Sequence, residues 1–156
     1  MTPAAAPTDE AGPSGDEAPT GEHLLLYDGV CGLCNGIVRF VIERDSRGVF
    51  DFAALQGPSG QACLRRFDKS VTDLDTVYVV VAYRSPVPII LERSRAAIFI
   101  LANLRRPWRW LAAAYVLPTW ILDRLYNVVA RNRYRWFGRY DTCLLPQPEV
   151  AKRFLD

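Results

Sequence analysis

The sequence predicts an α/β fold in which a mixed sheet is followed by a C-terminal helical extension. Apolar runs of strand length alternate with segments of helical periodicity over residues 23–104, in the order β-α-β-α-β-β-α. The whole chain has 156 residues, of which 50% are hydrophobic, so one domain with a sizeable core is expected. We therefore divide the chain into residues 1–22, a core at 23–104 and an extension of the same domain at 105–156.

Four segments have the pattern of strands. Residues 23–27 (HLLLY) form a short apolar run that ends at a turn, Asp28-Gly29, which is typical of a buried strand. Residues 49–53 alternate around two phenylalanines, and 76–83 (TVYVVVAY) is the strongest strand signal in the chain. A turn then leads to a fourth strand at 88–91. A helix between the first two strands predicts a parallel pair, to which the later hairpin adds antiparallel strands.

Helices are expected between and after these strands. Residues 34–45 place their apolar side chains at helical spacing, 58–67 form a shorter helix, and 95–104 form a third with Ser94 as its cap. Residues 107–132 also have a helical pattern, which Pro118 divides in two because proline removes a backbone donor. This last helical segment forms most of the extension.

Residues 1–22 have the composition of a disordered acidic tail. They contain four prolines, three glycines, five acids and no Lys or Arg. They also lack the basic start and apolar run of a secretory signal, so we expect a cytoplasmic protein. The longest mostly apolar stretch, at 110–122, is 13 residues with a proline inside, whereas a membrane-spanning helix needs about 20.

The pair Cys31-x-x-Cys34 lies where the first strand gives way to the first helix. Free amide groups and the positive end of the helix dipole stabilise a thiolate at such a position. We therefore expect Cys31 to be a nucleophile, and the spacing brings Cys34 close enough to attack a mixed disulfide formed on Cys31. This pattern predicts a thiol-disulfide oxidoreductase that acts on a disulfide-containing protein or a small thiol substrate.

Other roles for the cysteines remain open. The CxxC pair would be half of a zinc site if Cys63, Cys143 or His23 supplied two further ligands, but none of these lies in a second metal-ligand motif. The alternative function is therefore a noncatalytic CxxC module that binds zinc or a protein partner. Taken alone, Cys63 is typical of a small buried hydrophobic residue, and Cys143 has either a structural or a supporting redox role.

Asp28 lies three residues before Cys31 and has two possible roles. Its side chain either accepts hydrogen bonds from the turn amides as a local cap or, as a partly buried carboxylate, takes the proton from Cys34 during resolution. Both roles are compatible. His23, the only histidine, begins the first strand and is interpreted as an edge residue rather than as a catalytic base.

The segment Tyr27-Asp28-Gly29-Val30-Cys31-Gly32-Leu33-Cys34-Asn35 resembles the DxxCxxC signature of the DCC family of predicted thiol-disulfide oxidoreductases. Later pieces resemble that family's C-terminal half: Leu117-Pro118, Asp123, Tyr126, Asn132-Arg133-Tyr134, and Phe137-Gly138 through Cys143. The resemblance covers roughly residues 23–146. It implies a thioredoxin-like fold and assigns the family's functional positions to Asp28, Cys31 and Cys34.

The chain departs from the wider thioredoxin pattern at one place. Thioredoxin-like proteins usually have a cis-proline opposite the CxxC pair, where this chain has Leu74-Asp75-Thr76-Val77. A cis peptide without proline costs about 3 kcal/mol. We therefore expect an all-trans chain and a differently built substrate groove.

The segment 105–139 is rich in arginine and tryptophan. It holds eight arginines, one acid and all four tryptophans. Nucleic-acid binding is not expected, because the helical spacing of Trp110, Tyr115, Ile121, Leu122 and Leu125 favours core packing. A solvated basic rim is the simplest interpretation, and peripheral membrane contact is the alternative. The chain has no phosphate-binding glycine loop, so no nucleotide cofactor is expected, and its oligomeric state stays open.

Overall fold

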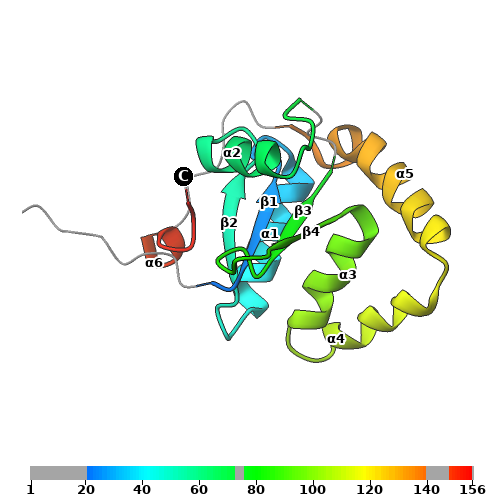
Figure 1. Ribbon diagram of the computed structural model, residues 1–156. Coiled ribbons are helices and arrows are strands. Elements are labelled where there is room, and N and C mark those ends of the chain that lie inside the picture. Colours follow the sequence, from blue (N-terminus) through cyan, green and yellow to red (C-terminus); the bar gives the residue numbers. More distant parts are fainter. Residues whose placement is uncertain (1–20, 73–75, 140–147, 156) are drawn as a thin grey trace, which may run out of the picture.

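A four-stranded mixed sheet, in the order β2-β1-β3-β4, lies at the centre of the structure (Figure 1). The computed structural model describes residues 21–72, 76–139 and 148–155. The first two strands are parallel, and the other two neighbouring pairs are antiparallel. The strands are β1 (His23–Tyr27), β2 (Phe50–Ala54), β3 (Tyr78–Val81) and β4 (Ile89–Glu92).

Helices cover both faces of the sheet, which explains why β1 is buried along its whole length. Alternate side chains of a strand point to opposite faces. Leu25 and Tyr27 pack in a core with α1 (Gly32–Arg44) and α3 (Arg93–Asn103), whereas Leu24 and Leu26 pack in a second core with α2 (Pro58–Arg66). A strand covered on both sides becomes a continuous apolar run, as this one is.

The chain after α3 runs around the outside of that helix and returns to the CxxC end of α1 (Figure 1). It forms α4 (Trp108–Leu111), the 3-10 helix η1 (Ala112–Val116) and the long α5 (Thr119–Phe137). The final described segment, with α6 (Pro148–Ala151), instead lies at the β2 edge, where the backbone of Phe52 hydrogen-bonds Arg153 and Leu155. No helix within the described ranges is long and apolar enough to cross a membrane.

The predicted thioredoxin-like α/β fold is confirmed, and its elements occur in the predicted order. The strand expected at 76–83 is shorter than predicted. At its start the N–H of Val77 donates to the hydroxyl of Tyr126 (2.8 Å), and at its end Ala82 has a φ of 50°. Both features interrupt the ladder of backbone hydrogen bonds.

The first two described residues belong to the segment predicted as a tail. The N–H of Glu22 donates to the carbonyl of Val49 (2.9 Å), and its carbonyl accepts from Tyr83 (3.2 Å). Gly21 is buried beside Asp51. The rest of the predicted tail lies outside the described residues.

Two predictions about single residues are wrong. Ser94 does not cap α3, because β4 runs directly into that helix and Ser94 lies inside its first turn, where its hydroxyl donates to Asp123 of α5. His23 is not an edge residue, because β1 is an inner strand. Its ring is buried beside Phe50 and Phe99, and its Nδ1 accepts from the Ala82 amide at 3.1 Å.

The expected core packing of the arginine- and tryptophan-rich segment is also wrong in part. Ile121 and Leu122 are half-buried, but Trp110, Tyr115 and Leu125 are exposed. Among the described elements, α4 and η1 make their main contacts with α3 and with each other. The all-trans expectation fails at a different place, since Arg106-Pro107 is a cis peptide bond of the X-Pro type, for which the energetic cost is small.

Candidate functional site

Cys31 occupies the N-cap of α1, so its sulfur lies at the free amides that begin this helix. Its backbone is extended (φ −82°, ψ 123°), and its Sγ accepts a hydrogen bond from the amide of Cys34 at 3.3 Å. The Asn35 side chain holds the turn by donating to the carbonyls of Gly29 (2.8 Å) and Cys31 (2.9 Å). The sulfur therefore takes the place that an oxygen takes in an ordinary helix cap.

These contacts lower the pKa of Cys31 to about 6. The largest cause is a hydrogen bond from the Cys34 thiol, which stabilises the thiolate. Burial opposes this effect, while the Cys34 amide and the nearby Arg133 guanidinium support it. Cys31 is therefore mostly a thiolate at neutral pH.

The partner thiol has the opposite tendency. The pKa of Cys34 is raised, first because its proton is held in the hydrogen bond to Cys31 and then because of burial. The Asp28 carboxylate adds to this effect, and Arg133 opposes it. The geometry therefore distinguishes a nucleophilic sulfur from one that keeps its proton.

Asp28 is fully buried, and both of its oxygens accept hydrogen bonds. Oδ1 accepts from the Val30 amide (3.1 Å), as the local cap predicts, and from Gln56 Nε2 (2.6 Å). Oδ2 accepts from Arg133 Nη2 (3.1 Å) and from the Tyr134 hydroxyl. The turn cap is therefore present, and the same carboxylate also belongs to a buried ion pair.

Arg133 is the member of this site that reasoning from sequence did not assign. It is 2% exposed, it lies 105 positions after Asp28, and its charge acts on both sulfurs. A buried arginine needs an anionic partner, and nothing local in the sequence identifies Asp28 as that partner. The one available signal was the likeness of Asn132-Arg133-Tyr134 to the DCC pattern.

The last residue of α5 and the two residues after it cover the CxxC pair. The carbonyl of Gly138 accepts from the Gly32 amide at 3.2 Å, and Arg139 forms an antiparallel bridge with Cys31. Gly138 has a φ of 78°, which glycine adopts without strain. Under this covering segment, residues 137–139, Cys31 is 0% exposed and Cys34 is 2% exposed.

An apolar cavity of about 320 Å³ lies on the other side of Cys34. It is bounded by α1, α3, α5 and Val77, the residue just before β3, whose amide donates to the Tyr126 hydroxyl. Val77 is the last residue of the stretch that stands where thioredoxin-like proteins usually have the cis-proline. Because its amide donates to Tyr126, that amide is already hydrogen-bonded within the chain. The cavity is lined by Leu33, Cys34, Ile37, Val77, Ala97, Leu125, Tyr126, Val129, Ala130 and Arg133.

The remaining candidate ligands do not join the CxxC pair. His23 lies at the opposite end of β1, and Cys63 packs with the α2 core on the other face of the sheet, where burial raises its pKa. Cys143 lies outside the described residues. Over the described ranges, no three His, Cys, Asp or Glu side chains are grouped so that they could hold a metal ion.

The covering segment leads to a prediction about access. A Cβ at position 32 would lie 2.2 Å from the carbonyl oxygen of Phe137, so Gly32→Ala must displace that segment. Loss of the Gly32–Gly138 hydrogen bond, worth about 1 kcal/mol, should raise the alkylation rate of Cys31 roughly fivefold. The rate is measured by mass spectrometry of iodoacetamide-treated protein.

Gly36→Ala is the matched control, because it lies in the same helix and a Cβ there meets nothing within 4 Å. Both variants gain the same preference of alanine for a helix. Equal alkylation rates in the two variants would show that residues 137–139 do not limit access.

The lowered pKa of Cys31 leads to a second prediction. Thiolate absorbance near 240 nm in the reduced protein should rise with a midpoint at about pH 6, and Cys31→Ser should lose this step. The folded pKa is below the unfolded value of about 8.5, so the thiolate adds to stability as the pH rises between these values, and the gain is lost below the folded pKa. Cys63→Ala should keep the step, and a first step above about pH 8 would contradict the assignment.

Comparison with known proteins shows the family of this chain. The sequence model of the DCC1-like thiol-disulfide oxidoreductase family matches residues 25–139. An uncharacterized Bacillus subtilis protein, YuxK, is 38% identical over 132 residues, which cover 85% of this chain and 93% of that protein. A chloroplastic DCC family protein of Arabidopsis thaliana is 37% identical over 123 residues, which cover 78% of this chain and 69% of that protein. No solved structure matches. The chain belongs to the DCC1-like thiol-disulfide oxidoreductase family.

Proposed function

We propose that the protein is a dithiol oxidoreductase that exchanges disulfides with a protein or a small-molecule partner through Cys31 and Cys34. The observation that carries this proposal is the helix-cap position of the Cys31 sulfur, where its pKa is lowered to about 6 while that of Cys34 is raised. A nucleophile needs the first property, and a resolving thiol that waits for a mixed disulfide has the second. Membership of the family supports a general redox role.

The first step is attack by the Cys31 thiolate on a substrate disulfide. A bond forms between Cys31 and one substrate sulfur, and the other substrate sulfur leaves as a thiolate that takes a proton from water. Cys34 then loses its proton and attacks the Cys31 sulfur, which breaks the bond between Cys31 and the substrate and releases the second substrate sulfur as a thiolate that is protonated in turn. The protein ends as the Cys31–Cys34 disulfide, and the substrate has gained two electrons and two protons. A thiol donor regenerates the dithiol by the reverse exchange.

We propose Asp28 as the base for the second step. Once Cys31 carries the substrate, the hydrogen bond between the two thiols is lost, but burial and the Asp28 charge still keep the Cys34 proton in place. A base at this point removes that proton as attack begins. Arg133, paired with the carboxylate at 3.1 Å, positions Asp28 for this transfer.

Two features on either side of the thiols define how a substrate reaches them. Residues 137–139 hide Cys31 from solvent, so the first step follows their displacement. The apolar cavity beside Cys34 then receives an apolar side chain or group of the substrate. We place the reaction in the cytoplasm, where thiols of this kind are kept reduced.

Cysteine substitutions test the proposed function. Cys31→Ser should abolish reduction of a model disulfide such as insulin, and Cys63→Ala should leave most of the activity, because Cys63 packs on the opposite face of the sheet. Cys34→Ser should accumulate a mixed disulfide on Cys31, which nonreducing gels and peptide mapping detect.

The same protein preparations test the alternative function, a noncatalytic module that binds zinc or a protein partner. Near-stoichiometric zinc in the purified protein, with no titratable thiols, would favour a noncatalytic module. Full activity of Cys31→Ser would reject the proposed nucleophile.

The role of Asp28 leads to a kinetic prediction. Asp28→Asn should slow the decay of the mixed disulfide once it has formed, because Cys34 stays protonated. The defect should shrink as the pH rises, since hydroxide then replaces the lost base. Stopped-flow release of a thionitrobenzoate group from Cys31, followed from about pH 6 to about pH 9, measures this decay.

The pH profile separates catalysis from structure. Asparagine retains an oxygen that accepts from the Val30 amide, so a residue that only caps the turn would change the decay rate little at any pH. A rate ratio near one throughout the range would therefore remove Asp28 from the mechanism.

A further inference from the structure

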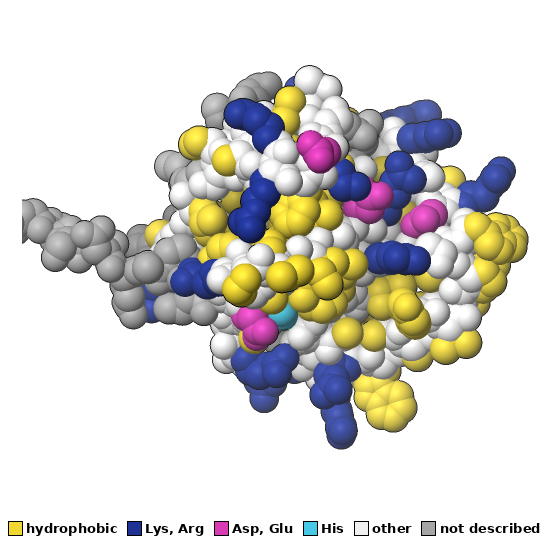
Figure 2. Space-filling view, in the orientation of Figure 1, with side chains coloured by type: hydrophobic (Ala, Val, Ile, Leu, Met, Phe, Trp, Pro, Cys, Tyr) yellow, Lys and Arg dark blue, Asp and Glu magenta, His cyan; other side chains and the backbone are white. Residues whose placement is uncertain are grey.

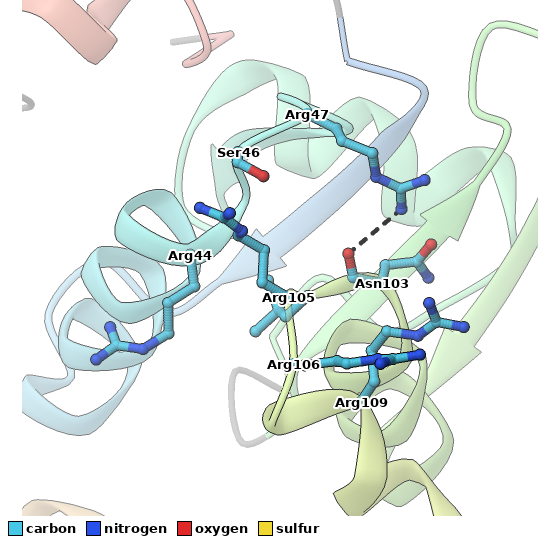
Figure 3. Close-up of a pocket in the computed structure, with 8 residues that line it drawn as sticks. Arg44, Ser46, Arg47, Asn103, Arg105, Arg106 and Arg109 are labelled. Carbon is cyan, nitrogen blue, oxygen red and sulfur yellow. Dashed lines mark hydrogen bonds between the residues drawn. The ribbon is translucent and has the colours of Figure 1, made fainter.

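A pocket lined by five arginines lies at the C-terminal end of α1, the helix whose first turn carries the CxxC pair (Figure 3). Its volume is about 440 Å³, and its walls come from the α1–β2 turn and from the connection between α3 and α4. We name it the arginine pocket. It is lined by Arg44, Ser46, Arg47, Asn103, Leu104, Arg105, Arg106 and Arg109.

The guanidinium groups are not neutralised by neighbouring carboxylates of the described chain. Only Arg44 has an ion pair, with Glu43 at 2.9 Å, and its side chain points away from the others (Figure 3). Arg47 donates to the backbone carbonyl of Asn103 (3.4 Å), which leaves its charge uncompensated. Arg105, Arg106 and Arg109 form no ion pair with a described residue. Such a pocket favours an anion of phosphate type.

Exposed apolar side chains continue directly from this pocket along the chain. Arg109 lies between two tryptophans, and the surface beyond it exposes Trp110 (72%), Val116 (88%) and Trp120 (69%). No acidic residue occurs between Glu92 and Asp123. We name this surface the apolar rim. It comprises Trp110, Leu111, Tyr115, Val116, Leu117 and Trp120.

The two features lie at the same end of the molecule. Figure 2 shows Lys and Arg side chains along the lower edge, where Figure 1 places the α3–α4 connection. A hydrophobic side chain, coloured yellow, projects beside these basic side chains in Figure 2. Further hydrophobic side chains lie along the lower right edge, where Figure 1 shows the chain between α4 and α5. A basic cluster therefore borders a convex apolar surface.

We infer that this end of the molecule docks on an anionic lipid bilayer, with a headgroup phosphate in the arginine pocket and the apolar rim among the upper acyl chains. Tryptophan and tyrosine prefer the membrane interface, and arginine binds lipid phosphate with two hydrogen bonds. The rim exposes apolar side chains of α4, η1 and the start of α5, and exposed apolar side chains beside a basic cluster suit a lipid interface. This inference goes beyond the proposed redox function and does not depend on it.

Vesicle binding by the full chain tests the inference. Wild type should cosediment with vesicles made of equal parts phosphatidylglycerol and phosphatidylcholine, and should not cosediment with phosphatidylcholine alone. Replacing Arg105 and Arg106 together with glutamine should lower the partition coefficient about tenfold or more, because each charge near an anionic surface adds to the attraction. Val116→Ser should also weaken binding, because it removes an apolar side chain from the acyl region.

Two control variants match these changes at other surfaces. Replacing Arg65 and Arg66 of α2 with glutamine removes the same charge, and both residues are exposed. Val87→Ser removes the same side chain at a site that is 80% exposed. Both controls should bind as wild type does. All four variants should retain thiol-disulfide exchange in solution, so failure of vesicle binding is distinguishable from failure of the proposed function.

Several results would overturn the inference. Absence of wild-type binding to the anionic vesicles would do so, as would equal losses in the test and control variants. Tight binding of inorganic phosphate, together with unchanged vesicle binding by Val116→Ser, would show a pocket for a soluble anion. Conversion of a dimer to a monomer by Val116→Ser, measured by light scattering, would show that the apolar rim is covered by a second copy of the chain.

Discussion

The buried ion pair between Asp28 and Arg133 is the interaction on which the site depends. It joins the end of the first strand to the last turns of α5. Both side chains are almost excluded from water, and breaking a buried ion pair by removing one partner costs about 3–5 kcal/mol. The pair holds the last turns of α5 beside the start of α1, where Gly138 and Arg139 contact Gly32 and Cys31.

Two features of the closed site have opposite effects on the reactivity of Cys31. The Cys34 thiol and amide stabilise its thiolate inside the closed site, yet the covering segment keeps the same sulfur from solvent. Activation and access are therefore controlled by different parts of the chain. The CxxC turn, residues 31–34, controls activation of the Cys31 thiol, whereas Gly138 and its neighbours control access to it.

The long helix α5 connects the redox site with the opposite surface of the extension. Trp120 in its first turn belongs to the apolar rim, and Arg133 near its end contacts Asp28. At a rise of 1.5 Å per residue these positions are about 20 Å apart along the helix axis. A bilayer in contact with the apolar rim would therefore lie away from the CxxC end of the molecule.

The sequence by itself determined the order of strands and helices, the helix-start position of Cys31 and the turn contact of Asp28. Local periodicity and turn chemistry decide these features, because they depend on residues close together in the chain. The tertiary structure alone decided the pairing of Asp28 with Arg133, the burial of His23 on an inner strand and the exposure of Trp110. Each depends on which distant elements pack together, and that is settled by the burial of whole faces, which a local pattern does not specify.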